Sequence, residues 1–95
     1  ALGQYSVKQD GYHVVSEKEA VQMNCNYTGT EYSLQWYRQF SNKKIFPILL
    51  LTASANKSQG HFTMFLDTNK KFTSLSINSV QIEDSAVYYS AMEAL

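Results

Sequence analysis

The side chains that could support catalysis are few, and their spacing does not suit it. The 95 residues contain two histidines, His13 and His61, and one cysteine, Cys25. No serine or cysteine stands in a motif typical of an activated nucleophile, and the adjacent acids Glu83 and Asp84 are better explained as turn residues than as an acid–base pair. No glycine-rich phosphate loop and no metal-ligand spacing is present in the sequence. We therefore predict a protein that is not an enzyme and that needs no cofactor and no metal ion.

Length and composition indicate one small globular domain over residues 1–95. Hydrophobic residues make up 44% of the chain and charged residues 17%, which argues against disorder, and the length suits a single core. Eight basic and eight acidic side chains cancel, so no charge pattern favours binding to nucleic acid. The longest apolar run, Ile45 to Leu51, contains Pro47 and is too short to span a bilayer. We expect no direct membrane insertion by this sequence.

The cysteine and two asparagines give opposite indications of the compartment. A lone cysteine permits no intrachain disulfide and no zinc cluster, and it is typical of a reducing compartment or of an inert core position. Two N-glycosylation sequons, Asn26-Tyr27-Thr28 and Asn56-Lys57-Ser58, indicate a secreted protein instead. Such triplets often arise by chance, so these residues alone leave both interpretations open.

Short alternating runs separated by turn residues dominate the chain, and helical periodicity is nearly absent. From Val21 to Tyr27, for example, every second residue is apolar. Pro47 indicates an edge strand or a bulge, because proline offers no N–H group to a strand ladder. Eight or nine such strands at regular spacing predict an all-β sandwich or barrel.

Three of these residues form a recognisable constellation: Cys25 on an early strand, Trp36 on the next and Tyr88 on a late one. Together with Trp36-Tyr37-Arg38-Gln39 and Asp84-x-Ala86-x-Tyr88-Tyr89, they resemble an immunoglobulin variable-type domain, a two-sheet Greek-key sandwich. More narrowly, the stretches 16–21, 34–39 and 83–89 are similar to the variable segments of T-cell receptor α or δ chains. The resemblance runs from about Gln4 to Met92.

The resemblance implies roles for the inward-facing residues. The structural core is expected to include Cys25, Trp36, Leu75, Tyr88 and Ser90. The Tyr88 hydroxyl is expected to bond to the backbone of the crossing loop at residues 78–83, in a tyrosine corner. In the family, Asp84 pairs with an arginine at the start of the strand at residues 60–66, and here His61 holds that place.

Two departures from the family pattern concern the last residues. Ser90 stands where the family has the second cysteine of its intersheet disulfide, so we expect that bridge to be absent and Cys25 to be a buried, unreactive thiol. The missing bridge would have stabilised the domain by about 4 kcal/mol. The family also continues into a joining segment that forms the last strand, and this chain stops at Leu95. We expect that strand to be missing, leaving the edge of the strand at residues 86–92 exposed or covered by another chain.

The resemblance also implies two interaction surfaces. Three loops should meet at one end of the sandwich and contact a ligand through Thr28, Thr30, Glu31, Tyr32, Ser33, Ala53, Ser54, Asn56, Met92 and Glu93. Outward-facing residues of one sheet should pack against a second variable domain of β or γ type through Tyr37, Gln39, Phe46, Pro47 and Tyr89. Leu49 is a further candidate for that face, and Gln39 would meet a matching glutamine. A homodimer through the same face is the alternative.

The function implied by the resemblance is antigen recognition: a T-cell receptor variable domain, extracellular and part of a membrane-anchored receptor, that contacts peptide or lipid held by an MHC-type molecule. The alternative is a surrogate or truncated variable-like chain that acts in receptor assembly or dimerisation without binding antigen. A third interpretation is an engineered chain, shortened and with its cysteine replaced. Asn26, at a strand end, and Asn56, at a loop tip, are the glycosylation candidates.

Overall fold

Nine strands and one turn of 3-10 helix make up the regular structure in the described part of the chain. The structure is a computed structural model that describes residues 4–7, 12–14 and 18–94, with side chains described for residues 20–30 and 32–93. In chain order the elements are β1 (Gln4–Val7), β2 (Tyr12–Val14), β3 (Lys18–Asn26), β4 (Glu31–Gln39), β5 (Ile45–Leu51), β6 (Ala55–Gln59), β7 (Phe62–Asp67), β8 (Phe72–Val80), the 3-10 turn η1 (Ile82–Asp84) and β9 (Ala86–Ala94). The predicted all-β class is confirmed.

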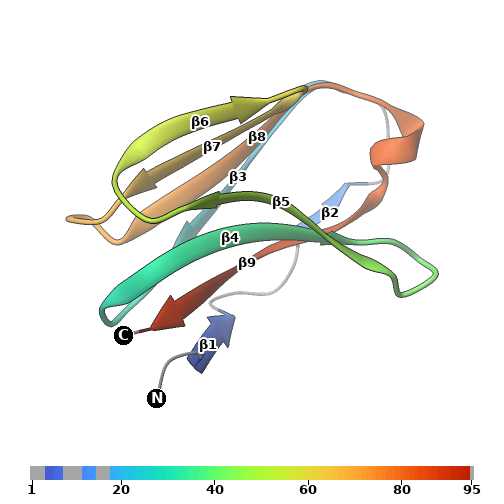
Figure 1. The fold of residues 1–95 in the computed structure, drawn as a ribbon. Helices are drawn as coiled ribbons and strands as arrows, with labels where there is room; N and C mark the ends of the chain where they lie inside the picture. Colours follow the sequence, from blue (N-terminus) through green and yellow to red (C-terminus); the bar gives the residue numbers. More distant parts are fainter. Residues whose placement is uncertain (1–3, 8–11, 15–17, 95) are drawn as a thin grey trace.

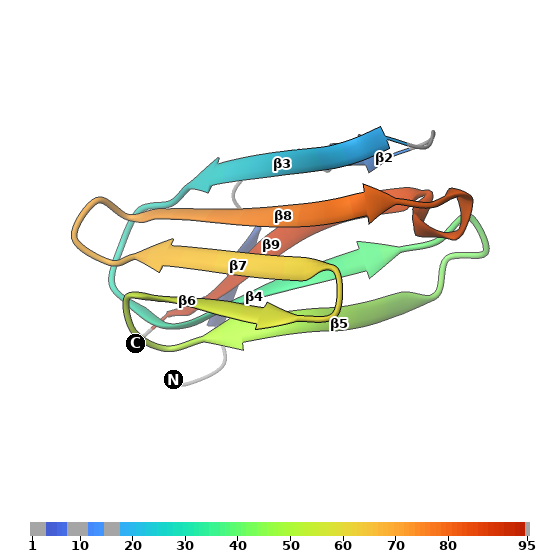
Figure 2. The same ribbon diagram turned by 90° about the horizontal axis from the view of Figure 1, so that it is seen from above.

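The strands form two antiparallel sheets that lie face to face (Figures 1 and 2). One sheet has the strand order β3-β8-β7-β6. In the other sheet β4 lies between β5 and β9, and both β1 and β2 pair with the far side of β9. Consecutive strands β5 and β6 therefore belong to different sheets. The arrangement confirms the predicted two-sheet sandwich.

The pairing of β9 corrects one expectation. β1 pairs with residues Ala91 to Ala94 and β2 with Ala86 to Tyr88. Along its other side β9 pairs with β4. We expected one edge of this strand to be exposed or covered by another chain, and that was wrong. An uncovered strand edge presents unpaired N–H and C=O groups, and here the N-terminal strands of the same chain pair with them.

The core is built around Trp36, from inward-facing side chains of both sheets. Trp36, Leu75, Tyr88 and Ser90 have no exposed surface, and Cys25 is 2% exposed. Strand alternation explains this, because every second residue of each strand points into the space between the sheets.

In the described part of the chain, the buried polar atoms around Trp36 are hydrogen-bonded, with one exception. The indole Nε1 donates to Thr73 Oγ1 at 3.1 Å, and the Thr73 hydroxyl donates to the Phe65 carbonyl at 2.7 Å. Ser90 stands opposite Trp36 in the register of β9 and β4. Its buried Oγ has no hydrogen-bond partner among the described residues. An unpartnered buried hydroxyl costs about 1–3 kcal/mol of stability.

Tyr88 and Asp84 hold the turn that precedes β9. The Tyr88 hydroxyl donates to the Asp84 carbonyl at 2.7 Å, so a tyrosine corner forms one residue beyond the loop we predicted. The Asp84 carboxylate accepts the Gln81 backbone N–H at 2.9 Å and lies 3.4 Å from Arg38 Nη1. Asp84 therefore pairs with Arg38 on β4, and His61 is exposed. Arg38 reaches the carboxylate because it stands opposite Tyr88 in the register of β4 and β9.

Burial changes the acidity of the corner tyrosine. Removal from water raises the pKa of the Tyr88 hydroxyl above its usual value, because burial disfavours the phenolate. The guanidinium of Arg38, whose Nη1 lies 3.5 Å from this hydroxyl, offsets part of the rise.

The register between β4 and β5 shifts next to Pro47. Trp36 stands opposite Leu49, whereas its neighbour Tyr37 stands opposite Pro47, so Ile48 is the extra residue. Within the described residues β5 pairs only with β4. Pro47 thus lies on an edge strand beside a bulge, as its missing N–H predicted.

Candidate functional site

The connections expected to contact a ligand lie together at one end of the sandwich. The β3–β4 connection, the β5–β6 connection and the end of β9 gather on the left in Figure 1. Figure 2 shows the same grouping from above. The sheet topology therefore brings three segments that are distant in sequence to one surface.

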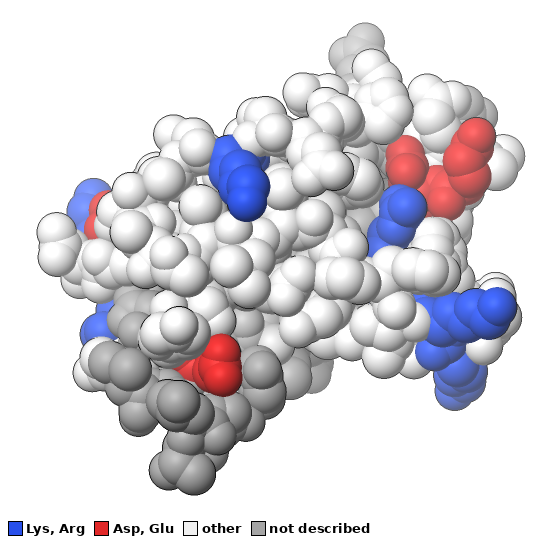
Figure 3. Space-filling model, in the orientation of Figure 1, with Lys and Arg blue, Asp and Glu red and all other residues white. Residues whose placement is uncertain are grey.

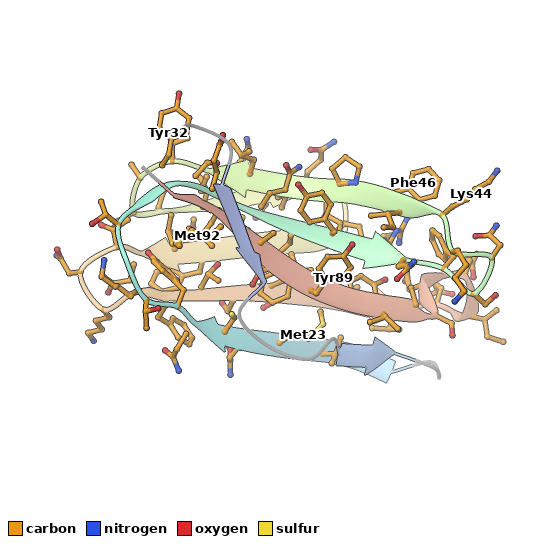
Figure 4. The ribbon with its side chains drawn as sticks, turned by 90° about the horizontal axis from the view of Figure 1, so that it is seen from below. Met23, Tyr32, Lys44, Phe46, Tyr89 and Met92 are labelled. Carbon is orange, nitrogen blue, oxygen red and sulfur yellow. The ribbon has the colours of Figure 1, made fainter. Side chains whose placement is uncertain are left out.

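Tyr32 is the most prominent described side chain of the first segment. Its side chain is 54% exposed, and Figure 4 shows it pointing away from the sandwich. Thr28 and Thr30 are also exposed. Tyr32 lies inside a strand, because β4 begins at Glu31, although we expected these residues in a loop. An exposed phenol beside two threonines can bind through both apolar contact and hydrogen bonds.

Two residues expected at the surface of this end are buried. Met92 is 3% exposed, and its Cε lies 3.7 Å from the point that a Cβ on Gly29 would occupy. Ser33 is 6% exposed and donates to Glu93 Oε1 at 3.4 Å. Met92 faces inward because it shares a face of β9 with Tyr88. The expected ligand contact by these two residues is therefore corrected: Met92 lies in the core, and Ser33 is buried against Glu93 on the other face of the sheet.

The second segment is polar and exposed. Ala53 and Ser54 lie at the surface, and Ser54 Oγ accepts the Thr68 backbone N–H at 2.9 Å. Asn56 is exposed too, but it lies within β6 and not at a loop tip as expected. Of the predicted residues at the end of β9, Glu93 is partly exposed.

A second candidate surface is the outer face of the sheet made by β9, β4 and β5. Tyr37 stands opposite Pro47 on one side and Tyr89 on the other. The two tyrosine rings stack, with centroids 5.6 Å apart and an interplanar angle of 19°. The Tyr37 hydroxyl donates to Gln35 Oε1 at 3.3 Å. Pro47, Tyr37 and Tyr89 thus form a row across three strands, in which the two tyrosines stack.

Three further residues share this outer face. Gln39 stands opposite Ile45, and its Nε2 donates to the Lys43 carbonyl at 3.3 Å. Ile45 is 49% exposed, and Leu50, opposite Gln35, is 39% exposed. Neither Ile45 nor Leu50 was predicted to lie on this surface. Alternation with Pro47 would have indicated Ile45, whereas Leu50 follows the bulge and could be assigned only with the position of the bulge known.

Phe46 and Leu49, both candidates for this face, lie elsewhere. Phe46 stands opposite Arg38 and is exposed, but it belongs to the inner side of β5, and its ring meets that of Phe40 at 5.7 Å. Phe46 also lines a groove of about 420 Å³ shared with Arg38 and His61. Leu49 is 3% exposed and lies in the core. Both expectations are corrected: Phe46 and Pro47 are neighbours and so face opposite sides, and the bulge after Pro47 turns Leu49 inward.

The chemistry available on these surfaces is that of non-covalent recognition. Figure 3 shows that most of one broad side carries neither acidic nor basic groups. In the described ranges, no three His, Cys, Asp or Glu side chains come together in a way that could hold a metal ion. No helix among the described residues has the length and hydropathy to cross a membrane. Exposed tyrosine, threonine and serine groups can supply contact area and hydrogen bonds.

Comparisons with known proteins agree with this architecture. The family model for the immunoglobulin V-set domain matches residues 8–94. Human T cell receptor alpha variable 36/delta variable 7 is 36% identical over 81 residues, covering 84% of this chain and 72% of the relative. Human T cell receptor alpha variable 40 is 40% identical over 87 residues, covering 88% and 77%. Human T cell receptor alpha variable 9-2 is 36% identical over 94 residues, covering 95% and 82%.

Proposed function

This chain belongs to the immunoglobulin V-set family, among the T-cell receptor α/δ variable domains, and from that membership we propose that it pairs with a second variable domain and recognises an antigen presented by an MHC-type molecule. The paired receptor would act outside the cell as part of a larger membrane-anchored protein. The observation that carries the proposal is the ordered Tyr37–Tyr89 stack on an outer sheet face.

The stack supports pairing because aromatic side chains that are already ordered lose little entropy on binding. Tyr37 and Tyr89 are held by each other, by the β4–β9 register and by the bond from Tyr37 to Gln35. Exposed Ile45 and Leu50 extend the apolar surface on both sides of the row. A row of aromatic residues bordered by apolar ones is typical of the centre of a protein interface.

The partner that fits this face is a variable domain of β or γ type. Gln39 on the outer face retains its Oε1 as an acceptor while its Nε2 is bonded to Lys43, so a partner glutamine could donate to it. A second copy of this chain presents the same groups and is the competing occupant. Measuring association with and without a β-type domain separates the two.

The experiment compares Tyr37→Ala and Tyr89→Ala with the matched control Tyr32→Ala. Truncating either stacked ring should weaken association with a β-type domain by about tenfold or more, because central aromatic residues dominate such interfaces. Tyr32 lies at the end of the sandwich, so its truncation should leave pairing unchanged. Sedimentation or calorimetry gives the affinities. Wild-type affinity in the Tyr37→Ala/Tyr89→Ala double variant would refute the assigned face.

Antigen contact is the second part of the proposal and is tested separately. Tyr32, Thr28 and Thr30 are exposed at the end where three segments meet. Tyr32→Ala in the paired receptor should reduce binding to a presented peptide or lipid while leaving pairing intact. Equal ligand binding by the wild type and this variant would remove Tyr32 from the contact surface.

A second candidate function is assembly of a receptor without antigen binding. The observation that favours it is the burial of Met92 and Ser33, which reduces the contact area at the ligand end. Under this alternative the chain would pair with a β-type domain, and no presented ligand would bind the pair. Scoring pairing and ligand binding in the same co-expression experiment distinguishes the two functions.

A further inference from the structure

The two N-glycosylation sequons occupy the two edges of the four-stranded sheet. Asn26 is the last residue of β3, and Asn56 is the second residue of β6. These strands are the first and last in the order β3-β8-β7-β6. Both asparagine side chains are exposed. Within the described residues, neither side-chain amide is used in a hydrogen bond.

The register places both asparagines on the same outer face of this sheet. Asn26 stands opposite Phe72, Asn56 stands opposite Phe65, and Phe65 stands opposite Ser74. Residues directly opposite each other point to the same face, and Phe72 and Ser74 share a face because they are two residues apart on β8. The rings of Phe65 and Phe72 meet with centroids 6.1 Å apart. The two sequons therefore flank an aromatic pair.

These edges are exposed to strand pairing between molecules. All five residues of β6 are exposed, and β6 pairs only with β7 among the described strands. On the other side of the sheet, β8 is the only described strand that pairs with β3, since β1 and β2 pair with β9. A strand edge of this kind is a template for association with another chain unless something covers it.

We propose that Asn26 and Asn56 both carry N-linked glycans, and that the glycans shield the edges and the outer face of the four-stranded sheet from self-association. The opposite sheet, with the Tyr37–Tyr89 row, stays available for a partner. The inference rests on the proposed receptor function, because N-glycosylation requires passage through the secretory pathway. A glycan is bulky, solubilising and compatible with an exposed surface position.

The modification is a simple group transfer. A bond forms between asparagine Nδ2 and the anomeric carbon of an oligosaccharide, and the bond from that carbon to the pyrophosphate of a lipid-linked donor breaks. The amide loses one proton, and the lipid pyrophosphate is the leaving group. The secretory pathway supplies the donor.

The first measurement is site occupancy. The chain is secreted from a mammalian host, and its intact mass is determined before and after enzymatic removal of N-glycans, for the wild type, Asn26→Gln, Asn56→Gln and the double variant. The wild type should lose two glycans, each single variant one, and the double variant none. An unmodified Asn26 or Asn56 in the wild type would overturn the proposal.

The second measurement is self-association, by sedimentation velocity. Removing both glycans, by enzyme from the folded wild type or by the double substitution, should raise the self-associated fraction by about twofold or more, because the two edges become accessible. The enzyme-treated sample covers the case in which the double variant fails to fold. An unchanged distribution after enzymatic removal would contradict the shielding role.

A matched control moves one glycan to another part of the surface. Lys44→Thr turns Asn42-Lys43-Lys44, in the β4–β5 turn, into a sequon. In the Asn26→Gln/Asn56→Gln background, a glycan at Asn42 should leave the self-associated fraction raised. If a glycan at Asn42 suppresses self-association fully, the position of the glycan on the surface is irrelevant. Pairing with a β-type domain is scored in parallel. Lost pairing with both glycans present overturns only the proposed function, and missing glycans with intact pairing overturn only this inference.

Discussion

Replacing Ser90 with cysteine tests how this domain holds its two sheets together. Ser90 on β9 and Cys25 on β3 both face the core, and they are 0% and 2% exposed. Ser90 stands opposite Trp36, and its hydroxyl has no hydrogen-bond partner among the described residues. The position therefore combines the cost of a buried polar atom with the lack of a covalent link between the sheets.

The expected gain has two parts that can be separated. A disulfide between position 90 and Cys25 would close a loop of 64 intervening residues, worth about 4 kcal/mol in the chain-entropy model. Removing the unpartnered hydroxyl adds about 1 kcal/mol, and Ser90→Ala provides this part alone. In a domain of this size each kcal/mol shifts the Tm by about 4–8 °C. We expect Ser90→Ala to melt about 5 °C above the wild type and oxidised Ser90→Cys about 20 °C above it.

The assay is thermal and urea unfolding of the wild type, Ser90→Ala and Ser90→Cys, each with and without reductant. Reduced Ser90→Cys should behave like Ser90→Ala, since a buried thiol packs as a small apolar group. Thiol titration should find one cysteine in the wild type, reactive only after denaturation, and none in oxidised Ser90→Cys.

Two results would refute the reasoning. If Ser90→Cys stays reduced under oxidising conditions, or if oxidation leaves its unfolding midpoint unchanged, position 90 and Cys25 do not face each other across the core. If Ser90→Ala is less stable than the wild type, the buried hydroxyl does not carry the assigned cost.

Four further predictions concern the polar groups around the core. Tyr88→Phe should lower the free energy of unfolding by about 1 kcal/mol, because the bond to the Asp84 carbonyl is lost; equal urea midpoints would contradict this. Burial raises the pKa of Tyr88, so the folded chain keeps this proton to higher pH than the unfolded chain does. The stability that this raised pKa contributes is complete below the usual tyrosine pKa near 10 and is lost as pH rises above that value. The free energy of unfolding, measured between pH 8 and about 11, should therefore fall less steeply with pH in Tyr88→Phe than in the wild type. Equal slopes would argue against a raised pKa of Tyr88. Thr73→Val leaves the Trp36 indole N–H buried without its acceptor and should cost about 1–3 kcal/mol, which a wild-type Tm would disprove. Asp84→Ala removes both the acceptor of the Gln81 backbone N–H and the ion pair with Arg38, so calorimetry should show a larger loss, about 2 kcal/mol, than for Arg38→Ala. Because both variants break the ion pair, the reverse order would show that the contacts of Arg38 with Phe40 and Phe62 outweigh the bond to Gln81.

Much of the candidate site was predictable because strand alternation is a local property. The stacked pair Tyr37 and Tyr89 was assigned correctly to an outer face, since each belongs to a run in which inward neighbours are identifiable from the sequence. Met92 was expected at the ligand end from its place beyond Ser90, although the same alternation that turns Tyr88 inward also turns Met92 inward. That error came from treating the end of a strand as a loop.

The bulge in β5 was beyond local reasoning. Pro47 indicated an irregular edge strand, but the extra residue is defined only by pairing with β4. One inserted residue reverses every later side chain, which moved Leu49 into the core and Leu50 to the surface. The sequence pattern of β5 alone cannot reveal where that reversal occurs.

By itself, the sequence determined the all-β class, the family and the residues that fill the centre of the sandwich, because these depend on periodicity and on large side chains such as Trp36 and Tyr88. The tertiary structure decided which partners distant residues find. It gave Asp84 the guanidinium of Arg38, and it covered the edge of β9 with β1 and β2. The physical reason is that backbone edges and buried charges are satisfied by whatever group the fold brings within reach, and sequence separation does not predict that group.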